Sequence, residues 1–221
     1  MSEPIRKTYE EQLKTLDEMF VKLGRASAEA FSQAIAAVEN NDSQLAKTVI
    51  ENDRTINTME VDIETYAVRL ISLQQPIGVD LRKIVSILKS SSDLERIADH
   101  AVSIAKSVRR EDELNLKPLA NGLTAMSGQA HSMVIDAIDA FVTNDTDKAQ
   151  TIAERDEEVD HAFKTLLNDL VAEMEKNQAL SQVGTSYVST LSNIERIGDY
   201  ATNICERILY IDKAELFELN K

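Results

Sequence analysis

The stretch LERIADHA (residues 94–101) returns as IERIGDYA (residues 194–201), 100 positions further along the chain. Over eleven positions counted from Leu94 and from Ile194, the two copies keep the same Glu, Arg, Ile, Asp, Ala and Ile residues. A short match of this kind can arise by chance, so its meaning depends on whether the rest of the chain also repeats.

The segments that precede these stretches repeat as well. NDSQLAKTVIENDRTIN (residues 41–57) aligns with NDTDKAQTIAERDEEVD (residues 144–160) at an offset of 103. The offset then falls to 100, so the second copy has three residues fewer between its second and third helices. The first copy has QQPIG (residues 74–78) there, in a predicted turn, where a deletion is tolerated. The repeat therefore predicts a duplicated unit, with a first domain at residues 1–114 and a second at residues 115–221.

Long helices are predicted in both copies because few residues in the chain would end them. The sequence has six glycines and three prolines, and its apolar residues recur in steps of three and four, as on the buried face of an amphipathic helix. Asp42 and Asp145 stand at positions suited to helix N-caps. We therefore expect an all-α fold of two tandem, sequence-related three-helix bundles that pack along a pseudo-twofold axis. The six predicted helices cover residues 6–39, 43–73, 78–110, 118–142, 146–176 and 179–211.

The formal net charge of −14 restricts the classes of partner. Such a surface repels phosphate backbones and anionic lipid, so we expect neither nucleic-acid binding nor direct membrane insertion. The single cysteine, Cys205, excludes an internal disulfide framework, and its place on an apolar helical stripe predicts a core residue. The N-terminal residues lack the apolar core of a signal peptide, and we expect a cytoplasmic protein.

Pairs of carboxylates recur on the polar face of the repeated stretches. Glu95 and Asp99 lie four residues apart, on the side of the helix opposite its apolar stripe, and Glu195 and Asp199 have the same arrangement. Like charges at this spacing weaken a helix by about 0.2–0.5 kcal/mol. No basic residue follows either pair at the spacing that would offset this cost.

The middle helix of each copy adds carboxylates that flank its inward face. These are Asp53 in the first copy and Asp156 with Asp160 in the second, whereas Asn57 takes the fourth position of the first copy. If the helices of a bundle are adjacent, four carboxylates converge in the second copy, which suits a hard cation such as magnesium, manganese, calcium or iron. The alternative is a solvated acidic face in a chain that is acidic throughout.

The sequence contains no Gly-rich phosphate loop and no recognisable pairing of a nucleophile with a base. This pattern favours a non-catalytic regulator or adaptor. The competing hypothesis is a metal-dependent enzyme or a metal store that uses the carboxylate clusters.

The run LISLQQPIGVDLRKIVSILKSSSDLERIADHAVSIAK (residues 70–106) resembles the PhoU family, the accessory regulators of the bacterial phosphate-specific transport system. The matching motifs are QQP (residues 74–76), DLR (residues 80–82) and DLERIADHA (residues 93–101). The second copy of the last motif is IERIGDYATNICE (residues 194–206). The resemblance covers nearly the whole chain and includes the duplicated three-helix architecture.

This resemblance implies a cytoplasmic, non-catalytic homodimer that is a negative regulator of phosphate uptake and of the phosphate-starvation response. Its implied partners are the ATPase subunit of the phosphate transporter and a membrane sensor histidine kinase, through which it would regulate transcription indirectly. Members of the family carry a Glu/Asp-x-x-x-Asp motif, through which some bind clusters of iron or another metal. In this sequence the motif falls on Glu95/Asp99, Asp156/Asp160 and Glu195/Asp199, whereas Asp53 is followed by Asn57.

Overall fold

The structure is a computed structural model, and it describes residues 3–108, 117–177 and 181–219. Every regular element within these residues is an α-helix, as the sequence predicts. The helices are α1 (Glu3–Asn40), α2 (Ser43–Gln74), α3 (Val79–Lys106), α4 (Lys117–Thr143), α5 (Thr146–Glu154), α6 (Asp156–Lys176) and α7 (Ser181–Lys213).

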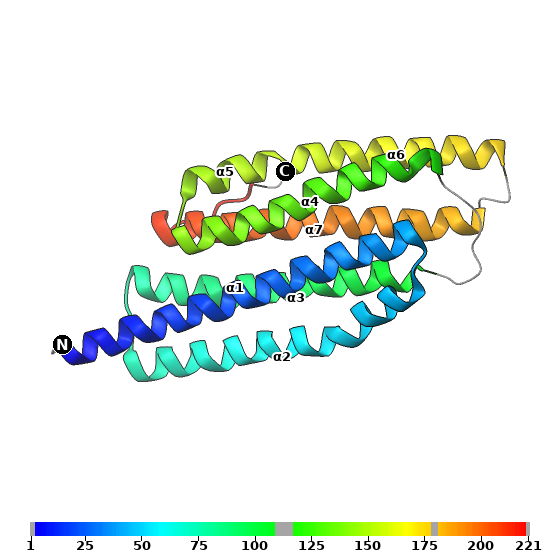
Figure 1. Ribbon diagram of the computed structural model, residues 1–221. Helices are drawn as coiled ribbons and strands as arrows, with labels where there is room; N and C mark the ends of the chain where they lie inside the picture. The colour runs from blue at the N-terminus through cyan, green and yellow to red at the C-terminus, as the bar shows by residue number, and fades with distance from the viewer. Residues whose placement is uncertain (1–2, 109–116, 178–180, 220–221) are drawn as a thin grey trace.

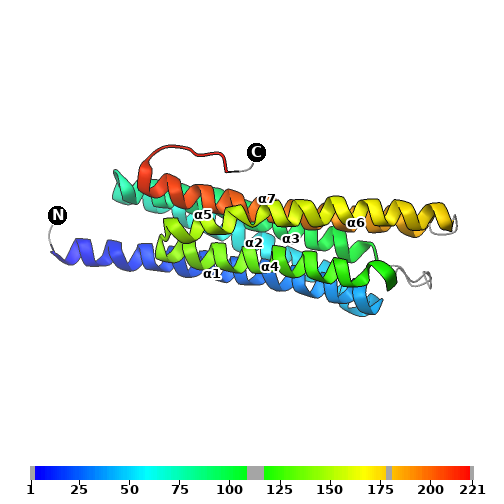
Figure 2. The same ribbon diagram turned by 90° about the horizontal axis from the view of Figure 1, so that it is seen from above.

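The helices form two bundles that lie along each other. Helices α1, α2 and α3 pack together as the first bundle, and α4, α5, α6 and α7 form the second. Figures 1 and 2 show an elongated molecule in which all helices run in roughly the same direction or its reverse. Helix α3 packs against α7 and α1 against α4, so the repeated stretches on α3 and α7 lie where the bundles meet.

The turn between the first two helices has the same construction in each bundle. Asn41 and Asn144 adopt left-handed backbone conformations, with φ of 49° and 51°, which asparagine tolerates better than most residues. The following aspartate then caps the next helix. A side-chain oxygen of Asp42 accepts two backbone N–H groups at 3.0 and 2.9 Å, and one of Asp145 accepts a single N–H at 2.9 Å. Both predicted N-caps are confirmed.

The helix predicted at residues 146–176 is divided at Arg155 into α5 and α6. Arg155 keeps a helical backbone, with φ −73° and ψ −14°, but its N–H bonds to the carbonyl three residues back instead of four. Its guanidinium donates to Asp136 on α4 at 2.7 Å and also to the Ser132 hydroxyl. The chain is thus fixed to α4 directly before Asp156.

One continuous core of buried apolar side chains runs through both bundles. Phe20 on α1 and Phe141 on α4 connect them, because their ring centroids are 4.5 Å apart and both side chains are buried. Cys205 is a buried core residue, as predicted, and burial raises the pKa of its thiol to about 12. None of the helices in the described part of the chain combines the length and apolar character needed to span a bilayer.

The predicted domain boundary between residues 114 and 115 lies outside the described residues, as do the predicted helix end at residue 110 and the start at residue 179. The other predicted helix ends lie within about three residues of the observed ones.

Candidate carboxylate sites

The carboxylates of the second bundle gather where α6 begins beside α7. Asp156 is the first residue of α6 and is 8% exposed, and Asp160 lies one turn further along the same helix. Glu195 and Asp199 are partly buried on α7. Burial, followed by the charges of Asp199, Asp160 and Glu195, raises the pKa of Asp156 to about 7. We call these four residues the second cluster, and the structure brings them together as predicted.

Gly198 provides the space for the Asp156 carboxylate. A Cβ atom at this position would lie 2.9 Å from Asp156 Oδ1, which is too close for an undistorted contact. The first copy has Ala98 at the equivalent position, and its Asp53 is partly buried where Asp156 is buried. The alanine-to-glycine difference between the repeated stretches therefore lets the second copy bury its carboxylate more deeply.

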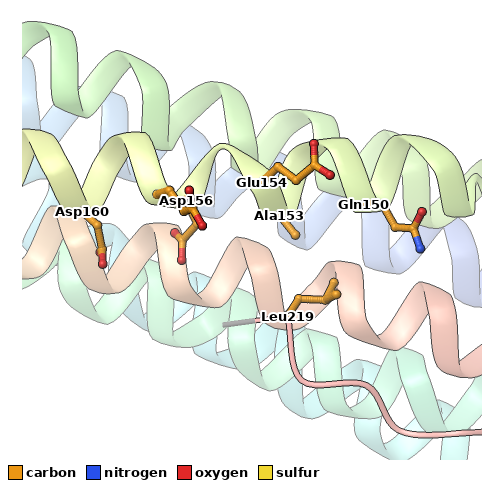
Figure 3. A pocket seen from close by; sticks show the side chains of 7 residues that line it. Gln150, Ala153, Glu154, Asp156, Asp160 and Leu219 are labelled. Atoms are coloured by element: carbon orange, nitrogen blue, oxygen red, sulfur yellow. The ribbon is translucent and has the colours of Figure 1, made fainter. Parts of the chain in front are cut away.

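A cavity of about 460 Å³ opens beside the second cluster (Figure 3). The residues that line it are Gln150, Ala153, Glu154, Asp156, Glu157, Asp160 and Leu219. Four of these seven side chains are carboxylates and none is basic, so the cavity presents a strongly negative wall. Figure 3 shows Asp160 directed from α6 toward α7, with Leu219 contributed by the C-terminal segment.

The corresponding site of the first bundle contains Asp53 on α2. Burial and then the charge of Asp99 raise the pKa of Asp53, whereas the Lys106 ammonium lowers it. Asn57 Nδ2 donates to Asp53 Oδ2 at 3.5 Å. This leaves Asp53 Oδ1 and Asn57 Oδ1 as buried oxygens with no hydrogen-bond partner among the described residues.

Two charged residues near Asp53 are missing from the set predicted from sequence. Burial and then neighbouring carboxylates, Glu60 among them, raise the pKa of Glu95, so Glu60 belongs with Asp53, Glu95 and Asp99 in what we call the first cluster. Glu60 lies seven residues after Asp53, two turns along the same face of α2, and this spacing could have identified it. The second is Lys106, which stands where the second copy has a glutamate.

A second cavity, of about 430 Å³, lies between α2, α3 and α7 and includes part of the first cluster. His100 Nδ1 on α3 is 2.7 Å from Asn193 Oδ1 on α7 at this boundary between the bundles. The cavity mixes acidic, basic and neutral polar side chains, in contrast to the acidic cavity of the second bundle. Its lining residues are Asp53, Arg96, Asp99, His100, Val102, Ser103, Lys106, Asn193 and Tyr200.

Burial, and after it the charges of neighbouring carboxylates, raises the pKa of Asp53, Glu95, Asp156 and Glu195. In the part of the chain that the structure describes, however, no three His, Cys, Asp or Glu side chains are gathered tightly enough to coordinate one ion. Their rotamers would have to change for the oxygen atoms to meet at a common point.

Two regions of the chain, residues 20–108 and 123–208, match the family model described as the PhoU domain. The chain belongs to the PhoU family. A Streptococcus pneumoniae serotype 4 protein named phosphate-specific transport system accessory protein PhoU homolog is 36% identical over 216 residues, which cover 98% of this chain and 100% of that protein. The phosphate-specific transport system accessory protein PhoU of Escherichia coli K12 is 35% identical over 207 residues, which cover 93% and 86% of the two chains.

Solved PhoU structures share the fold of this PhoU-family protein. The crystal structure of the phosphate transport system regulatory protein PhoU from Streptococcus pneumoniae superposes with a TM-score of 0.88 at 33% identity, over 95% of this chain and 99% of that one. The structure of PhoU from Pseudomonas aeruginosa gives a TM-score of 0.89 at 33% identity, over 94% and 100%. The family predicted from residues 70–106 and 194–206 is confirmed.

Proposed function

We propose that this PhoU-family protein is an accessory protein of a phosphate transport system and a negative regulator of phosphate uptake and of the phosphate-starvation response. The observation that carries this proposal is that both halves match the PhoU domain, while relatives named for phosphate-specific transport match over nearly the whole chain. In this proposal the protein is a cytoplasmic homodimer. It connects the transporter's ATPase subunit to a sensor histidine kinase, and so affects transcription indirectly.

The proposed role is that of an adaptor without catalytic activity. The printed names of the relatives describe accessory and regulatory proteins. The competing hypothesis, a metal-dependent enzyme, predicts turnover of a phosphate ester by the purified, metal-loaded protein in the absence of any partner. A phosphatase assay on that sample separates the two hypotheses.

Two surfaces of different character support a role in partner binding. Glu95 and Glu195 lie at related positions on α3 and α7 and give the surface negative charge. At the turn between α2 and α3, apolar side chains face solvent, with Leu73 64%, Ile77 84% and Val79 54% exposed. A basic surface of a partner would contact the acidic surface at Glu95 and Glu195. An apolar surface of a partner would contact the turn between α2 and α3.

Reversing the charge at both positions, with Glu95→Lys and Glu195→Lys together, is expected to weaken binding of the transporter ATPase or of the kinase at least tenfold, about 1.4 kcal/mol. Each lysine replaces attraction to a basic partner surface with repulsion. Binding is measured by co-purification and surface plasmon resonance, and circular dichroism checks that helicity is unchanged. Asp62→Lys together with Asp147→Lys is the matched control, because it makes the same two charge reversals at exposed sites on α2 and α5.

An Ile77→Asp variant in the same assay tests the apolar turn independently. A folded double lysine variant that keeps full binding and full regulation would contradict the role of the acidic surface. If the unmodified protein binds neither partner, the adaptor proposal is wrong.

We also propose that the carboxylate clusters bind a hard cation, with iron, magnesium and manganese as the candidates. The donors are of the right chemical type, because carboxylate oxygens are the ligands that hard cations prefer, and a change of side-chain rotamers would bring them to a common point. The first bundle also holds the unpartnered buried oxygens of Asp53 and Asn57, and the second holds the buried carboxylate of Asp156. A bound cation would supply the positive charge that offsets repulsion among the carboxylates. The proposed ligands are Asp53, Glu95 and Asp99 in the first bundle and Asp156, Asp160, Glu195 and Asp199 in the second.

The second bundle is expected to bind the cation more tightly than the first. Lys106 reduces the formal charge of the first cluster to −3 even though Glu60 compensates for Asn57, whereas the second cluster carries −4, and affinity for a hard cation rises with the negative charge of its ligands. Asp199→Asn should weaken the tighter site at least tenfold, about 1.4 kcal/mol. Asn57→Asp and Lys106→Glu should each strengthen the weaker site.

Calorimetric titration with Mn²⁺, Mg²⁺ and Fe²⁺ measures both sites, and Asp147→Asn, at an exposed position on α5, is the control for charge. No binding by the unmodified protein would identify the clusters as a solvated acidic face. Unchanged binding by the Asp199→Asn variant would show that the cation binds elsewhere.

A further inference from the structure

The C-terminal segment at residues 214–219 turns back and runs alongside α7 (Figures 1 and 2). Ala214 makes the reversal with a left-handed φ of 59°, and its N–H donates to the Tyr210 carbonyl at 3.0 Å. Residues with a Cβ atom seldom adopt this conformation, and glycine is usual there. Contacts further along the segment must therefore favour the reversed path.

Three contacts hold the segment in place. Lys213 Nζ lies 5.1 Å from the centroid of the Phe217 ring, within range of a cation–π interaction. The backbone N–H of Leu219 donates to Glu206 Oε1 at 2.7 Å, and the Leu219 side chain packs against the buried core. Leu216, in contrast, is 72% exposed. Leu219 is thus the residue that anchors the segment to the bundle.

Leu219 also forms part of the wall of the acidic cavity of the second bundle. It lines this cavity together with Ala153, Asp156 and Asp160, which belong to α5 and α6. Figure 3 shows the C-terminal segment passing the cavity on the side opposite these two helices, with Leu219 beside Ala153. The segment therefore covers one side of the space next to the buried carboxylate.

The cavity of the first bundle has a wall of a different kind. Asn193 and Tyr200 of α7, a long helix packed against α3, form the corresponding wall. Lys106 also stands where the second copy has Glu206, so the side-chain carboxylate that accepts the Leu219 N–H has no equivalent in the first copy. A packed helix borders one cavity, whereas a short segment without regular structure borders the other.

We propose that residues 214–219 form a strap over one side of the acidic cavity, and that release of Leu219 widens the access from solvent to Asp156. Beyond the turn at Ala214, the described contacts that hold the strap are one hydrogen bond from the Leu219 N–H to the Glu206 carboxylate, one apolar side chain and one cation–π contact. A segment without regular structure and with so few contacts opens at a much lower free energy than the bundle unfolds. Opening would admit a solute to the second cluster without disturbing the helices, whether or not that solute is a metal ion.

A single thiol in the cavity wall measures this opening. Ala153→Cys in a Cys205→Ala background places the thiol beside Leu219, and mass spectrometry follows its reaction with iodoacetamide. Leu219→Asp is expected to speed labelling at least tenfold, because a carboxylate at this position is repelled by the acidic wall and loses the apolar contact. A chain that ends at Lys213 should show the same acceleration, and Ala214→Gly, which relieves the left-handed alanine, should slow labelling.

Two controls make the result specific to the strap. Leu216→Asp makes the same substitution at the exposed leucine and should leave the labelling rate unchanged. Ser103→Cys places a thiol in the cavity of the first bundle, where the tail variants should have no effect. Equal rates for the full chain, Leu219→Asp and the shortened chain would overturn the proposal. It would also be overturned if Leu216→Asp accelerated labelling equally, or if labelling at Ser103→Cys rose in parallel, since general loosening would then explain the change.

Discussion

Asp156→Asn is expected to raise the free energy of unfolding by about 2–4 kcal/mol at pH 8 in the presence of a chelator. Most surface substitutions change the free energy of unfolding by far less than this, and most substitutions of any kind lower it. The gain is expected because the Asp156 carboxylate is buried beside three other carboxylates, which destabilise its charged form. The uncharged amide avoids that repulsion while keeping nearly the same shape.

The pH dependence of this effect follows from the pH at which the Asp156 carboxylate binds a proton in the folded and in the unfolded protein. The pKa of Asp156 is raised to about 7 in the folded protein, compared with an ordinary value of 3.8. Between these values the folded protein holds a proton that the unfolded chain releases. The resulting stability is fully present below about pH 4 and is lost as the pH rises through 7. Asp93 acts in the same direction, since burial raises its pKa to about 6.

Chemical denaturation at pH 5 and at pH 8 measures the effect. The unmodified protein should lose stability between these values, and the Asp156→Asn variant should lose clearly less. Glu157→Gln is the matched control, because it neutralises an exposed neighbour on α6 and should change stability by under about 0.5 kcal/mol. Parallel curves for the unmodified protein and the Asp156→Asn variant would show that the carboxylate is solvated in the folded state.

Phe141→Ala is expected to lower the free energy of unfolding by about 3–5 kcal/mol. The Phe141 ring is buried on α4, and its centroid is 4.5 Å from that of Phe20 on α1. The substitution removes apolar burial and also leaves a cavity between the two bundles, which the long helices cannot easily close. The loss should appear as a lower denaturation midpoint with an unchanged slope if the two bundles unfold together.

A double-mutant cycle with Phe20→Ala isolates the contact between the rings. The coupling free energy should be about 0.5–1.5 kcal/mol, as for other aromatic pairs. Phe217→Ala is the control, because this ring is in the C-terminal segment and should cost less than about 1 kcal/mol. Two separate transitions in the Phe141→Ala variant would show that the bundles fold independently. A loss below about 1 kcal/mol would show that the ring pair contributes little to their association.

The sequence by itself determined the helices and the duplication, because both depend on residues close together in the chain. The N-caps at Asp42 and Asp145 depend on the residues next to them in the chain, and the structure has both, each after an asparagine in the left-handed conformation. A spacing of four residues likewise fixes Glu195 and Asp199 on one face of a helix without any tertiary information. The same periodicity placed Cys205 in the core.

The tertiary structure decided which carboxylates are buried and what surrounds them. Asp156 is buried because a residue of another helix, Gly198, leaves room for its oxygen, and the repeat alone does not show which helix faces which. Two further interactions also occur between different segments of the chain. Lys106 lowers the pKa of Asp53, and the Leu219 N–H donates to Glu206. Helical periodicity fixes the direction of a side chain about its own axis. The distance between side chains on different helices depends on how those helices pack, which is set by the whole core at once.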